Sequence, residues 1–499
     1  MKLSKLFAGC DIDYRGGDLE VGGISSDSRK IKPGDVFICI KGEHRDGHDF
    51  AIEAQKKGAV LIVSEINIEG IEDIAMTPNT RLAESVMWYN FTERPCDGMT
   101  KIAVTGTAGK TSTVFILRHI LRAAGKKVGV ITTVRSYAGD DEIDMGKNGG
   151  SSVSDIAGAM TTPDPEFFFG AALEMKKKGC DTLIYEASSQ GLLLDKTSAI
   201  KNDIAVFTNL SPEHLDCHGT MENYFAAKAK LMNYSDCAVV NIDDPWISRL
   251  PGLFPDKEFI KISADPAKIG GSDVCSLRFV PHGADGIEYV YFSEKAVFRI
   301  KTPLIGRYSV YNTLEAAACA MNLGVGAMTV KEALFGMRGI DGRLSKVKSD
   351  TAPFNVFIDY AHTPESLKAA LTALREIAEG RLTVLFGCGG DRDRGKRSKM
   401  AETASKYADL VVITSDNPRS EDPMKIIGDI EKGIDKTKKY EVIPDRSEAL
   451  RHVIKTAEKG DTILLAGKGH EKYEITSSGK FPFDEEAIVT EETERIYKK

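Results

Sequence analysis

Residues 101–113, KIAVTGTAGKTST, carry the clearest structural pattern in the chain. The apolar run at 102–104 predicts a strand, and a turn containing Gly106 and Gly109 follows it. Apolar residues then recur at helical spacing, and Gly125 is placed to end that helix. A strand, a glycine-rich turn and a helix in this order predict a phosphate-binding loop, because backbone N–H groups and the helix N-terminus face the anion.

Two side chains strengthen this prediction. Lys110 is placed to neutralise a phosphate, and the Thr111 hydroxyl to reach Mg2+. The spacing departs from GxxxxGK[ST], because Val104 stands where the first glycine would be. An ordinary strand–helix turn with a surface lysine is the alternative. The combined pattern favours a nucleoside triphosphate site formed by Gly106, Thr107, Ala108, Gly109, Lys110, Thr111 and Ser112.

Composition narrows the function classes. At 499 residues the chain is too long for one core, so several domains are expected. The net charge of −7, from 66 Lys and Arg against 73 Asp and Glu, argues against nucleic acid as the main partner. No apolar run approaches the roughly 20 residues of a membrane span, and no apolar signal segment precedes Asp11. Nine scattered cysteines without a C-x-x-C pair suit reduced thiols, so we predict a cytoplasmic protein.

Strands and helices alternate along most of the chain, which predicts parallel sheets covered by helices. Region 272–302 differs, because its alternating pattern indicates a small antiparallel β insertion. We predict three α/β domains with bounds 1–98, 99–336 and 337–499. The strands expected are 36–40, 59–63, 128–133, 182–185, 204–208, 238–242, 355–359, 382–386, 410–414 and 462–466, and the helices 50–57, 165–178, 222–232, 365–378, 398–407, 423–434 and 446–458.

Ligand-binding groups in such folds lie just beyond the carboxyl ends of the parallel strands. Polar residues follow the predicted strands in this way in both larger domains. Any one such segment could be an ordinary capped turn, but their agreement across two domains favours a binding role. The segments are 161–163, 186–189, 209–218, Asp359 with His362, 387–397, 416–419 and 467–471.

Nine motifs occur in one order over nearly the whole chain, and DNPR (416–419) and GKGHE (467–471) are the most specific of them. With them the chain resembles the Mur ligases, and most of all the MurE type, the UDP-N-acetylmuramoyl-dipeptide:diamino-acid ligases of peptidoglycan synthesis. The resemblance implies a UDP-binding N-terminal domain, a central P-loop-type ATPase domain and a C-terminal Rossmann-like domain. The other motifs are GTAGKTST, TTP, EASS, HLDCHGTMENYFAAKAKLM, GRYSVYN, DYAHTP and GCGGDRDRGKR.

The resemblance also implies the reaction, which is ATP-driven amide formation through an acyl phosphate on the D-Glu γ-carboxylate. Because two anions must approach each other, charge neutralisation by Lys110 and Mg2+ dominates the catalytic problem. Thr111 and Glu186 are expected to bind one Mg2+, since that ion prefers oxygen ligands. His214 and Lys228, the latter as a CO2-derived carbamate, are expected to bind a second. From spacing alone Lys228 would be a solvated helix lysine, but the surrounding family motif favours the carbamate. Burial would lower the lysine pKa and expose a neutral amine to CO2.

Other contacts carry over by position. In the resemblance Asn312, Arg343, Asp359 and His362 contact ATP, while Ser28, His44, Thr161, Thr162, Ser188 and Lys196 bind the UDP-muramoyl-peptide. Gln190 and Lys196 depart from the residues common in relatives. Residues 139–158 are expected to be an inserted loop.

The fourth residue of DNPR decides the amine. Arg at this position goes with meso-diaminopimelate in the family, and Arg419 offers a planar fork for the distal carboxylate that lysine lacks. Glu471 is suited to the distal ammonium and Arg392 to another carboxylate. The predicted diamino-acid site comprises Arg392, Asp416, Asn417, Pro418, Arg419, Gly467 and Glu471.

Three alternatives stay open. The same ligase chemistry could use L-lysine or L-ornithine. A folylpolyglutamate-synthetase-like ligase shares the central and C-terminal plan but lacks an N-terminal domain like residues 1–95. A nucleotide-dependent binding module would give Glu186, His214, Lys228 and DNPR no purpose. We expect a monomeric enzyme whose partners are the UDP-muramoyl-dipeptide, ATP and a diamino acid.

Overall fold

The computed structural model describes residues 1–42, 45–143, 161–349 and 351–497. The chain divides into two compact units, which are described separately below. Unit 1 comprises Met1–Cys275 and Asn312–Val330, and unit 2 comprises Ser276–Tyr311 and Lys331–Lys499. No helix among the described residues is long and apolar enough to cross a membrane.

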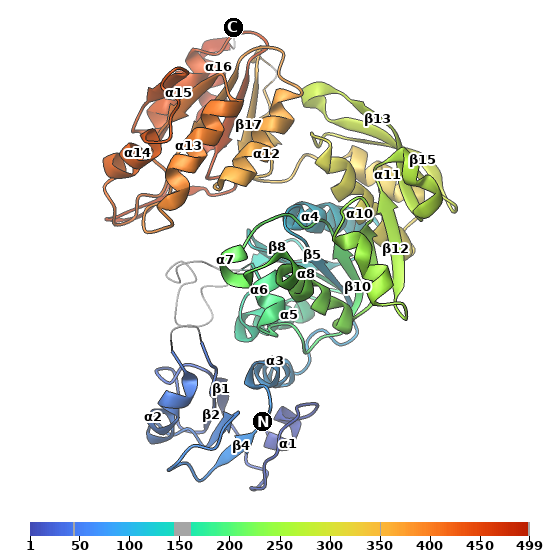
Figure 1. Ribbon diagram of the computed structural model, residues 1–499, viewed down its shortest axis with the longest axis vertical. Coiled ribbons are helices and arrows are strands. Elements are labelled where there is room, and N and C mark those ends of the chain that lie inside the picture. The colour runs from blue at the N-terminus through green and yellow to red at the C-terminus, as the bar shows by residue number, and fades with distance from the viewer. Residues whose placement is uncertain (43–44, 144–160, 350, 498–499) are drawn as a thin grey trace. The chain divides into compact units, whose positions relative to one another are not determined.

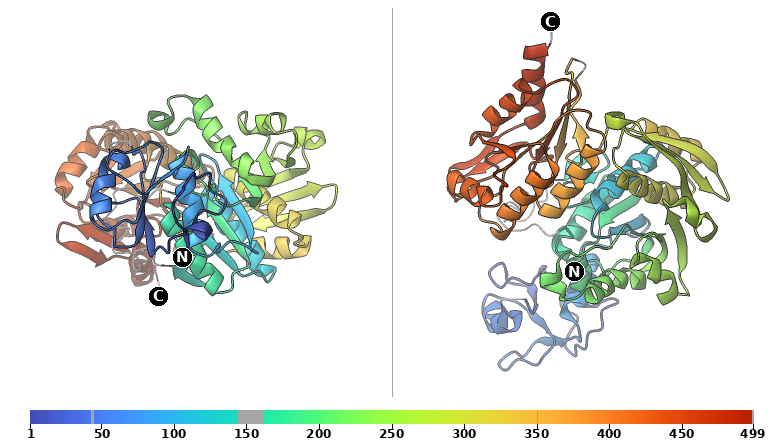
Figure 2. Two further views of the ribbon diagram at one scale, coloured as in Figure 1. Left: turned by 90° about the horizontal axis from the view of Figure 1, so that it is seen from below. Right: turned by 45° about the horizontal axis from the view of Figure 1, so that its top comes forward.

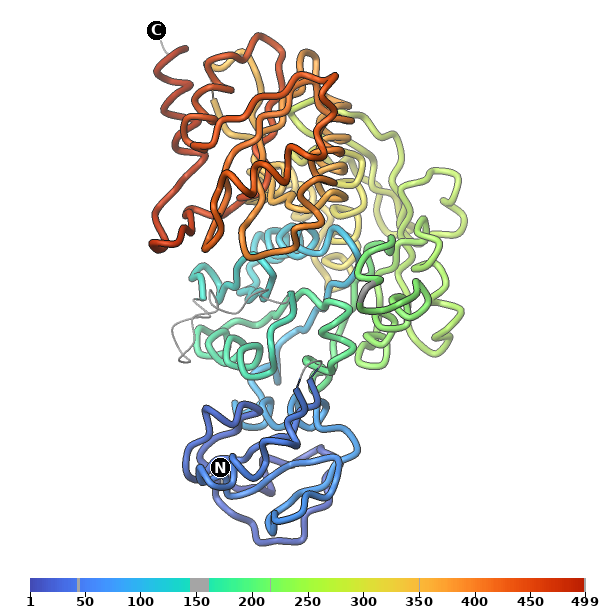
Figure 3. Tube along the Cα trace, turned by 60° about the vertical axis from the view of Figure 1, so that its left-hand side comes forward, coloured from blue at the N-terminus to red at the C-terminus, as the bar shows by residue number. Residues whose placement is uncertain are grey.

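The N-terminal part of unit 1 is built on a four-stranded parallel sheet in the order β1-β2-β3-β4, traced in blue in Figure 3. Each strand is short, and β2 and β3 are buried along their whole length. Two apolar clusters lie on either side of β2 and β3, one including Met87 of α3 and the other Ala51 and Ala54 of α2. The elements are α1 (Leu3–Leu6), β1 (Gly23–Ser25), β2 (Asp35–Ile38), α2 (Ala51–Lys56), β3 (Leu61–Ser64), β4 (Ile74–Met76) and α3 (Thr80–Phe91).

The central part of unit 1 is a larger sheet in the order β12-β11-β10-β5-β9-β6-β7-β8. Its strands β12 to β6 run parallel and are continuously apolar at the centre, as a sheet covered on both faces requires. The strands are β5 (Thr100–Thr105), β6 (Val128–Ile131), β7 (Ser136–Ala138), β8 (Asp141–Ile143), β9 (Thr182–Glu186), β10 (Asn202–Phe207), β11 (Ser235–Asn241) and β12 (Glu258–Ser263).

Helices join these strands in the expected alternation. An apolar cluster seats α5 and α8 against the sheet through Phe168, Phe169 and Tyr224, and α4 packs on β5, β6 and β9. Gly125 follows α4 with φ +82°, as the predicted helix stop requires. The helices are α4 (Lys110–Ala123), α5 (Pro165–Lys177), α6 (Ser189–Leu193), α7 (Leu215–His218), α8 (Met221–Ala229) and α9 (Leu250–Leu253).

The predicted β insertion differs in one respect from its expectation. β14 (Ile287–Ser293) and β15 (Val297–Thr302) form the antiparallel hairpin, whereas the start of β13 (Val274–Pro281) pairs parallel with β12. Helices α10 (Tyr308–Asn322) and α11 (Ala327–Phe335) follow. The insertion is therefore a hairpin preceded by one further parallel strand.

The C-terminal sheet of unit 2 has the order β16-β17-β21-β18-β19-β20, in which β17 to β20 are parallel. Helices α12, α13 and α14 cover one face and α15 and α16 the other, as Figures 1 and 2 show. This is the predicted doubly wound fold. Its elements are β16 (Ser345–Lys346), β17 (Asn355–Asp359), α12 (Pro364–Arg375), β18 (Leu382–Phe386), α13 (Gly395–Tyr407), β19 (Leu410–Ile413), α14 (Pro423–Glu431), β20 (Lys439–Val442), α15 (Arg446–Lys455), β21 (Thr462–Ala466), β22 (Tyr473–Thr476), β23 (Gly479–Pro482) and α16 (Glu485–Tyr497).

Candidate functional site

The predicted phosphate loop lies between β5 and α4, at the carboxyl edge of the central sheet. Gly106 and Gly109 have positive φ angles of +148° and +86°, which side chains rarely adopt. The ammonium group of Lys110 donates hydrogen bonds to the carbonyl oxygens of Gly106 and Thr107, at 2.9 and 2.8 Å. A Cβ atom at Gly109 would lie 2.6 Å from Oδ1 of Asn312, so α10 approaches the loop closely. Strand, loop and helix thus occur as predicted.

Two side chains just beyond β10, the strand that pairs with β5, hold the loop in place. Asn209, just beyond β10, accepts a hydrogen bond from the N–H of Ala108 at 3.0 Å and donates to its carbonyl oxygen at 3.0 Å. Thr208 Oγ1 donates to the same carbonyl at 2.7 Å. A side-chain amide that pairs with both the N–H and the C=O of one residue holds the two peptide groups on either side of that residue. The segment just beyond β10 therefore holds the loop in this conformation.

Lys228 of α8 is buried, with 2% of its surface exposed. Its Nζ donates to the carbonyl oxygen of Gly106 at 2.8 Å, the same oxygen that accepts from Lys110, and lies 4.7 Å from the centre of the Tyr224 ring. Burial lowers the pKa of Lys228 well below its ordinary value, and Lys110 lowers it further. The structure therefore brings this lysine to the phosphate loop and favours its neutral amine.

Glu186 ends β9, and its backbone is paired with Val104 of β5. The side chain is 1% exposed, and its two carboxylate oxygens accept from the backbone N–H and the hydroxyl of Thr133, at 3.4 and 3.0 Å. Thr111 is buried in the first turn of α4. A hydroxyl and a carboxylate are ligand types that fit Mg2+.

His214 has a different setting. It precedes α7 with φ +56°, its side chain is 53% exposed, and its Nε2 lies 3.9 Å from the Glu213 carboxylate. No group of three or more His, Cys, Asp and Glu side chains suited to a metal ion occurs within the described ranges.

Thr162 is the centre of the predicted muramoyl-peptide contacts. Its hydroxyl donates to the carbonyl oxygen of Glu186 at 2.9 Å and accepts from the N–H of Ser188 at 2.9 Å. Lys196, 4% exposed, donates to the carbonyl oxygen of Thr162 at 3.2 Å and pairs with Asp164 at 2.8 Å. Thr162, Ser188 and Lys196 therefore form one hydrogen-bonded group beside Glu186.

The remaining contacts of this set are less closely connected. Ser28 is buried, and its carbonyl oxygen accepts from Lys57 at 3.1 Å. Thr161 is half-buried. His44 and residues 144–158 of the predicted loop lie outside the described residues.

In unit 2, Asp359 ends β17 and its carboxylate accepts from the backbone N–H groups of Leu344 and Ala361, at 2.7 and 2.8 Å. Burial raises its pKa, and the nearby Arg343 opposes that rise. The exposed His362 has Nδ1 2.8 Å from the carbonyl oxygen of Tyr360. The three predicted ATP contacts of this unit thus lie at one sheet edge.

Two loops bring the predicted diamino-acid groups together. The N–H of Gly390 donates to the carbonyl oxygen of Asn417 at 2.9 Å, and the Arg419 guanidinium donates to the carbonyl oxygen of Gly390 at 2.9 Å. Both arginines lie beside Gly389, where a Cβ would lie 2.8 Å from Nη1 of Arg419 and 3.8 Å from Cγ of Arg392. Burial and repulsion from Arg419 lower the pKa of Arg392. Glu421 accepts from the buried Arg397 at 2.9 Å and holds the same loops.

Two carboxylates lie on the other side of this group. Glu471 accepts from the amide Nδ2 of Asn417 at 2.8 Å, and burial together with the Asp416 carboxylate raises its pKa. Gly467 has φ +110°, and a Cβ there would lie 2.6 Å from Oδ2 of Asp416. The loops after β18, β19 and β21 therefore join guanidinium and carboxylate groups, a combination that suits a zwitterionic ligand.

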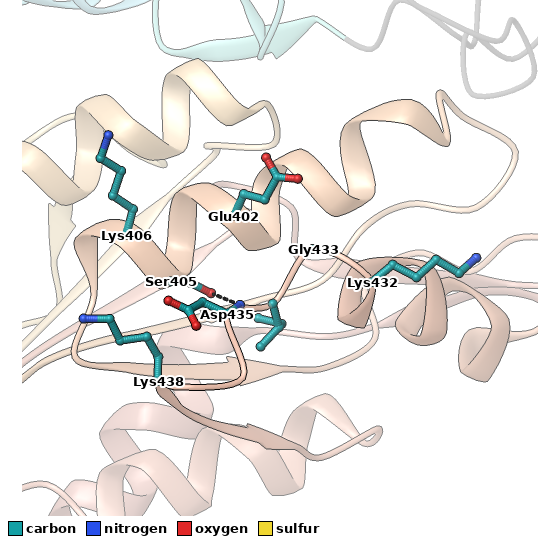
Figure 4. Close-up of a pocket in the computed structure, with 8 residues that line it drawn as sticks. Glu402, Ser405, Lys406, Lys432, Gly433, Asp435 and Lys438 are labelled. Atoms are coloured by element: carbon teal, nitrogen blue, oxygen red, sulfur yellow. Dashed lines mark hydrogen bonds between the residues drawn. The ribbon is translucent and has the colours of Figure 1, made fainter.

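One cavity of about 430 Å³ in unit 2 lies between α13 and the segment after α14, and none of the site residues named above lines it. Figure 4 shows that Lys406, Lys432 and Lys438 at its rim point in different directions rather than converging on one point. This geometry gives no reason to place a ligand there.

Comparison with known proteins decides the family. Family profiles match residues 20–81 (Mur ligase family, catalytic domain), 104–320 (Mur ligase middle domain) and 342–469 (Mur ligase, glutamate ligase domain). The chain belongs to the Mur ligase family. It is therefore an ATP-dependent ligase, and enzymes of this family use ATP with Mg2+.

Relatives agree over the full length of this Mur ligase. It is 38% identical to a UDP-N-acetylmuramoyl-L-alanyl-D-glutamate–2,6-diaminopimelate ligase of Syntrophomonas wolfei, over 98% of this chain and 99% of that one. It is 36% identical to such a ligase of Clostridium acetobutylicum, over 100% of both chains. A solved structure named as this ligase is 28% identical with a TM-score of 0.70, over 99% of both chains. The predicted family and fold class are confirmed.

Some residues of the Mur ligase site escaped sequence analysis. Asn209 was expected at a ligand-bearing edge but without its role in holding Ala108. Lys468, inside GKGHE, is fully buried beside Asn417 and was not singled out. The one sequence signal was its position directly after the buried strand β21. Its burial depends on Asn417 and Tyr473, which lie elsewhere in the sequence.

Proposed function

We propose that this Mur ligase adds meso-diaminopimelate to the D-Glu γ-carboxylate of UDP-N-acetylmuramoyl-L-Ala-D-Glu, at the expense of ATP, in peptidoglycan precursor synthesis. The relatives named above are diaminopimelate ligases by name, and their similarity extends over 98% and 100% of this chain. The single observation that carries the choice of amine is the presence at one sheet edge of Arg419, anchored through Gly390, and of Glu471, held by Asn417.

The distal end of meso-diaminopimelate bears one carboxylate and one ammonium group. Arg419 is half-buried and anchored through Gly390, so its planar guanidinium is held ready for a carboxylate. Glu471 offers the complementary charge for the ammonium group. L-Lysine and L-ornithine lack the distal carboxylate and would leave the Arg419 guanidinium without a substrate carboxylate.

The reaction needs an activated carboxylate. Attack of the substrate γ-carboxylate oxygen on the γ-phosphorus of ATP forms the acyl phosphate and releases ADP; attack by the amine then forms the amide and releases phosphate. Mg2+ supplies charge neutralisation at the phosphates. Lys110 supplies a further positive charge at the loop, and Thr111 and Glu186 offer oxygen ligands. The same proposal assigns Asn312, Arg343, Asp359 and His362 to ATP, and Ser28, His44, Thr161, Thr162, Ser188 and Lys196 to the UDP-muramoyl-peptide.

Lys228 completes this proposal as a carbamate. Its neutral Nζ adds to the carbon of CO2 and loses a proton, which gives an N-carboxylate that can join His214 on a second Mg2+. The depressed pKa and the position beside Gly106 support this role. Without the modification, Lys110 and Lys228 both donate to the same carbonyl oxygen, that of Gly106.

We also propose three domains with bounds 1–98, 99–336 and 337–499, a monomeric state and a cytoplasmic location. The folylpolyglutamate-synthetase-like alternative is disfavoured because the relatives match the N-terminal segment as well.

The test is phosphate release from purified protein with ATP, Mg2+ and the UDP-dipeptide, with each amine supplied separately. We expect turnover with meso-diaminopimelate and little with L-lysine or L-ornithine. Arg419→Ala should raise the KM for meso-diaminopimelate by about 10- to 100-fold and leave the KM for ATP unchanged. Equal effects on both KM values, or preferred use of L-lysine, would overturn the assignment of the amine.

A further inference from the structure

Lys468 is a fully buried lysine between β21 and β22, and none of the roles proposed above uses it. Its Nζ donates to the carbonyl oxygen of Tyr473 at 2.9 Å and to Oδ1 of Asn417 at 3.1 Å. It also lies 5.3 Å from the centre of the Phe483 ring. A buried ammonium group is costly unless its partners repay the desolvation. Its position therefore needs an explanation beyond packing.

The partners of Asn417 supply one. Its Oδ1 accepts from Lys468 and from the backbone N–H of Ile475, at 3.1 and 2.9 Å, while its Nδ2 donates to Oε2 of Glu471 at 2.8 Å. A side-chain amide has two orientations that differ by exchange of its oxygen and nitrogen. An ammonium group has only donors, so Lys468 and the Ile475 N–H together hold the oxygen of Asn417 on their side. The nitrogen must then face Glu471.

Charge balance points the same way. Burial lowers the pKa of Lys468, whereas the Asp416 carboxylate raises it. Glu471 and Asp416 are two acidic groups near each other, and Asp416 raises the pKa of Glu471. Lys468 lowers the pKa of Glu471, which favours its ionised form. An ionised, oriented carboxylate is what a substrate ammonium group requires.

We propose that Lys468 is a positioning and specificity residue for the amine substrate: it fixes the amide of Asn417, which holds the Glu471 carboxylate for the distal ammonium group of the diamino acid. This inference rests on the proposed diaminopimelate ligase function and deepens it. In this proposal Lys468 contacts Asn417 and not the substrate. Its removal should therefore reduce the preference for an amine substrate that carries the distal ammonium group bound by Glu471.

The probe is 2-aminopimelate, which keeps the distal carboxylate of diaminopimelate and lacks only the distal amino group. The measured quantity is the ratio of kcat/KM for meso-diaminopimelate to kcat/KM for L-2-aminopimelate. In Lys468→Met, which has similar length and no donor, we expect this ratio to fall by roughly 10- to 100-fold, the range of a hydrogen bond to a charged group. The KM values for ATP and for the UDP-dipeptide should change less than about twofold.

Two comparisons separate this role from a general structural one. The matched control is Lys459→Met, an exposed lysine in the turn before β21, which should keep the wild-type ratio. The second is a double-mutant cycle with Glu471→Gln. If Lys468 acts through Glu471, adding Lys468→Met to Glu471→Gln should change the ratio by less than about twofold, because the two effects are not additive.

Each outcome bears on one claim. An unchanged ratio in Lys468→Met, or full additivity in the cycle, would overturn the role of Lys468. A wild-type enzyme that does not use meso-diaminopimelate would instead overturn the proposed function. If Lys468→Met fails to fold, the same cycle is run with Lys468→Gln, which keeps a neutral donor and is expected to give a smaller, still non-additive fall.

Discussion

A buried carboxyl group links the phosphate-loop helix α4 to α10, and it predicts an unusual dependence of stability on pH. Glu315 is 0% exposed. Its Oε2 accepts from the Thr113 hydroxyl at 3.0 Å, and its Oε1 has no hydrogen-bond partner in the described part of the chain. Burial raises the pKa of Glu315 to about 8, and the bond from Thr113 offsets only part of that rise. Glu315→Gln keeps the size and the acceptor without a proton to lose.

The magnitude follows from proton linkage. The unfolded chain releases this proton near pH 4.5, and the folded chain holds it up to about pH 8. The folded state therefore binds more protons in this window, so the free energy of unfolding decreases as pH rises through it. Each pH unit is worth about 1.4 kcal/mol, so from pH 6 to pH 8 the wild type loses about 2 kcal/mol through this group. At about 2–4 °C per kcal/mol for a large domain, that loss is a fall in Tm of about 4–8 °C.

The assay is differential scanning calorimetry of wild type and Glu315→Gln at pH 6, 7 and 8 and constant ionic strength. We expect the Tm of the unit that contains α4 to rise in the variant relative to wild type, with a difference that grows toward pH 8. Glu258→Gln, at an exposed position on β12 of the same unit, is the control and should track wild type. A Tm difference that is the same at every pH would refute the reasoning.

Two further predictions concern the phosphate loop. Gly109→Ala should abolish detectable ATP binding in equilibrium dialysis, because its Cβ would lie 2.6 Å from Asn312 Oδ1. The control is Gly125→Ala, which has a similar φ of +82° but no atom within 4 Å of its Cβ and should keep ATP binding. Unchanged ATP binding in Gly109→Ala would contradict the importance of this contact. Lys228→Met should lower the rate of phosphate release by about 100-fold or more through loss of the carbamate ligand. The control Lys201→Met, at an exposed lysine, should leave that rate unchanged. Near-normal turnover in Lys228→Met would exclude the carbamate.

Local sequence patterns predicted the central strands and the phosphate loop, because neighbouring residues alone determine those structures. The strands at the centre of each sheet are almost continuously apolar, as in β18 and β21, because both of their faces are covered. The phosphate loop was predictable because a positive φ demands glycine at Gly106 and Gly109. Edge strands gave no such pattern. β20 is only half-buried and reads KYEV, so it was not predicted.

The missing site residues depend on pairing between distant parts of the chain. Asn209 contacts Ala108 across 101 positions, and Glu315 contacts Thr113 across 202. A sequence pattern shows a lysine or glutamate as a charge, which is usually exposed. Burial of Lys468 and Glu315 becomes evident only once the sheet edge and the helix pair around them are in place.

The most direct test of the central claim is a competition between amines. Purified enzyme, ATP, Mg2+ and UDP-N-acetylmuramoyl-L-Ala-D-Glu are incubated with equal concentrations of meso-diaminopimelate, L-lysine and L-ornithine, and the product is weighed by mass spectrometry. We predict a single product whose mass has increased by diaminopimelate less one water. A product that carries lysine or ornithine would contradict the role of Arg419, and no product would contradict the ligase reaction proposed for this chain.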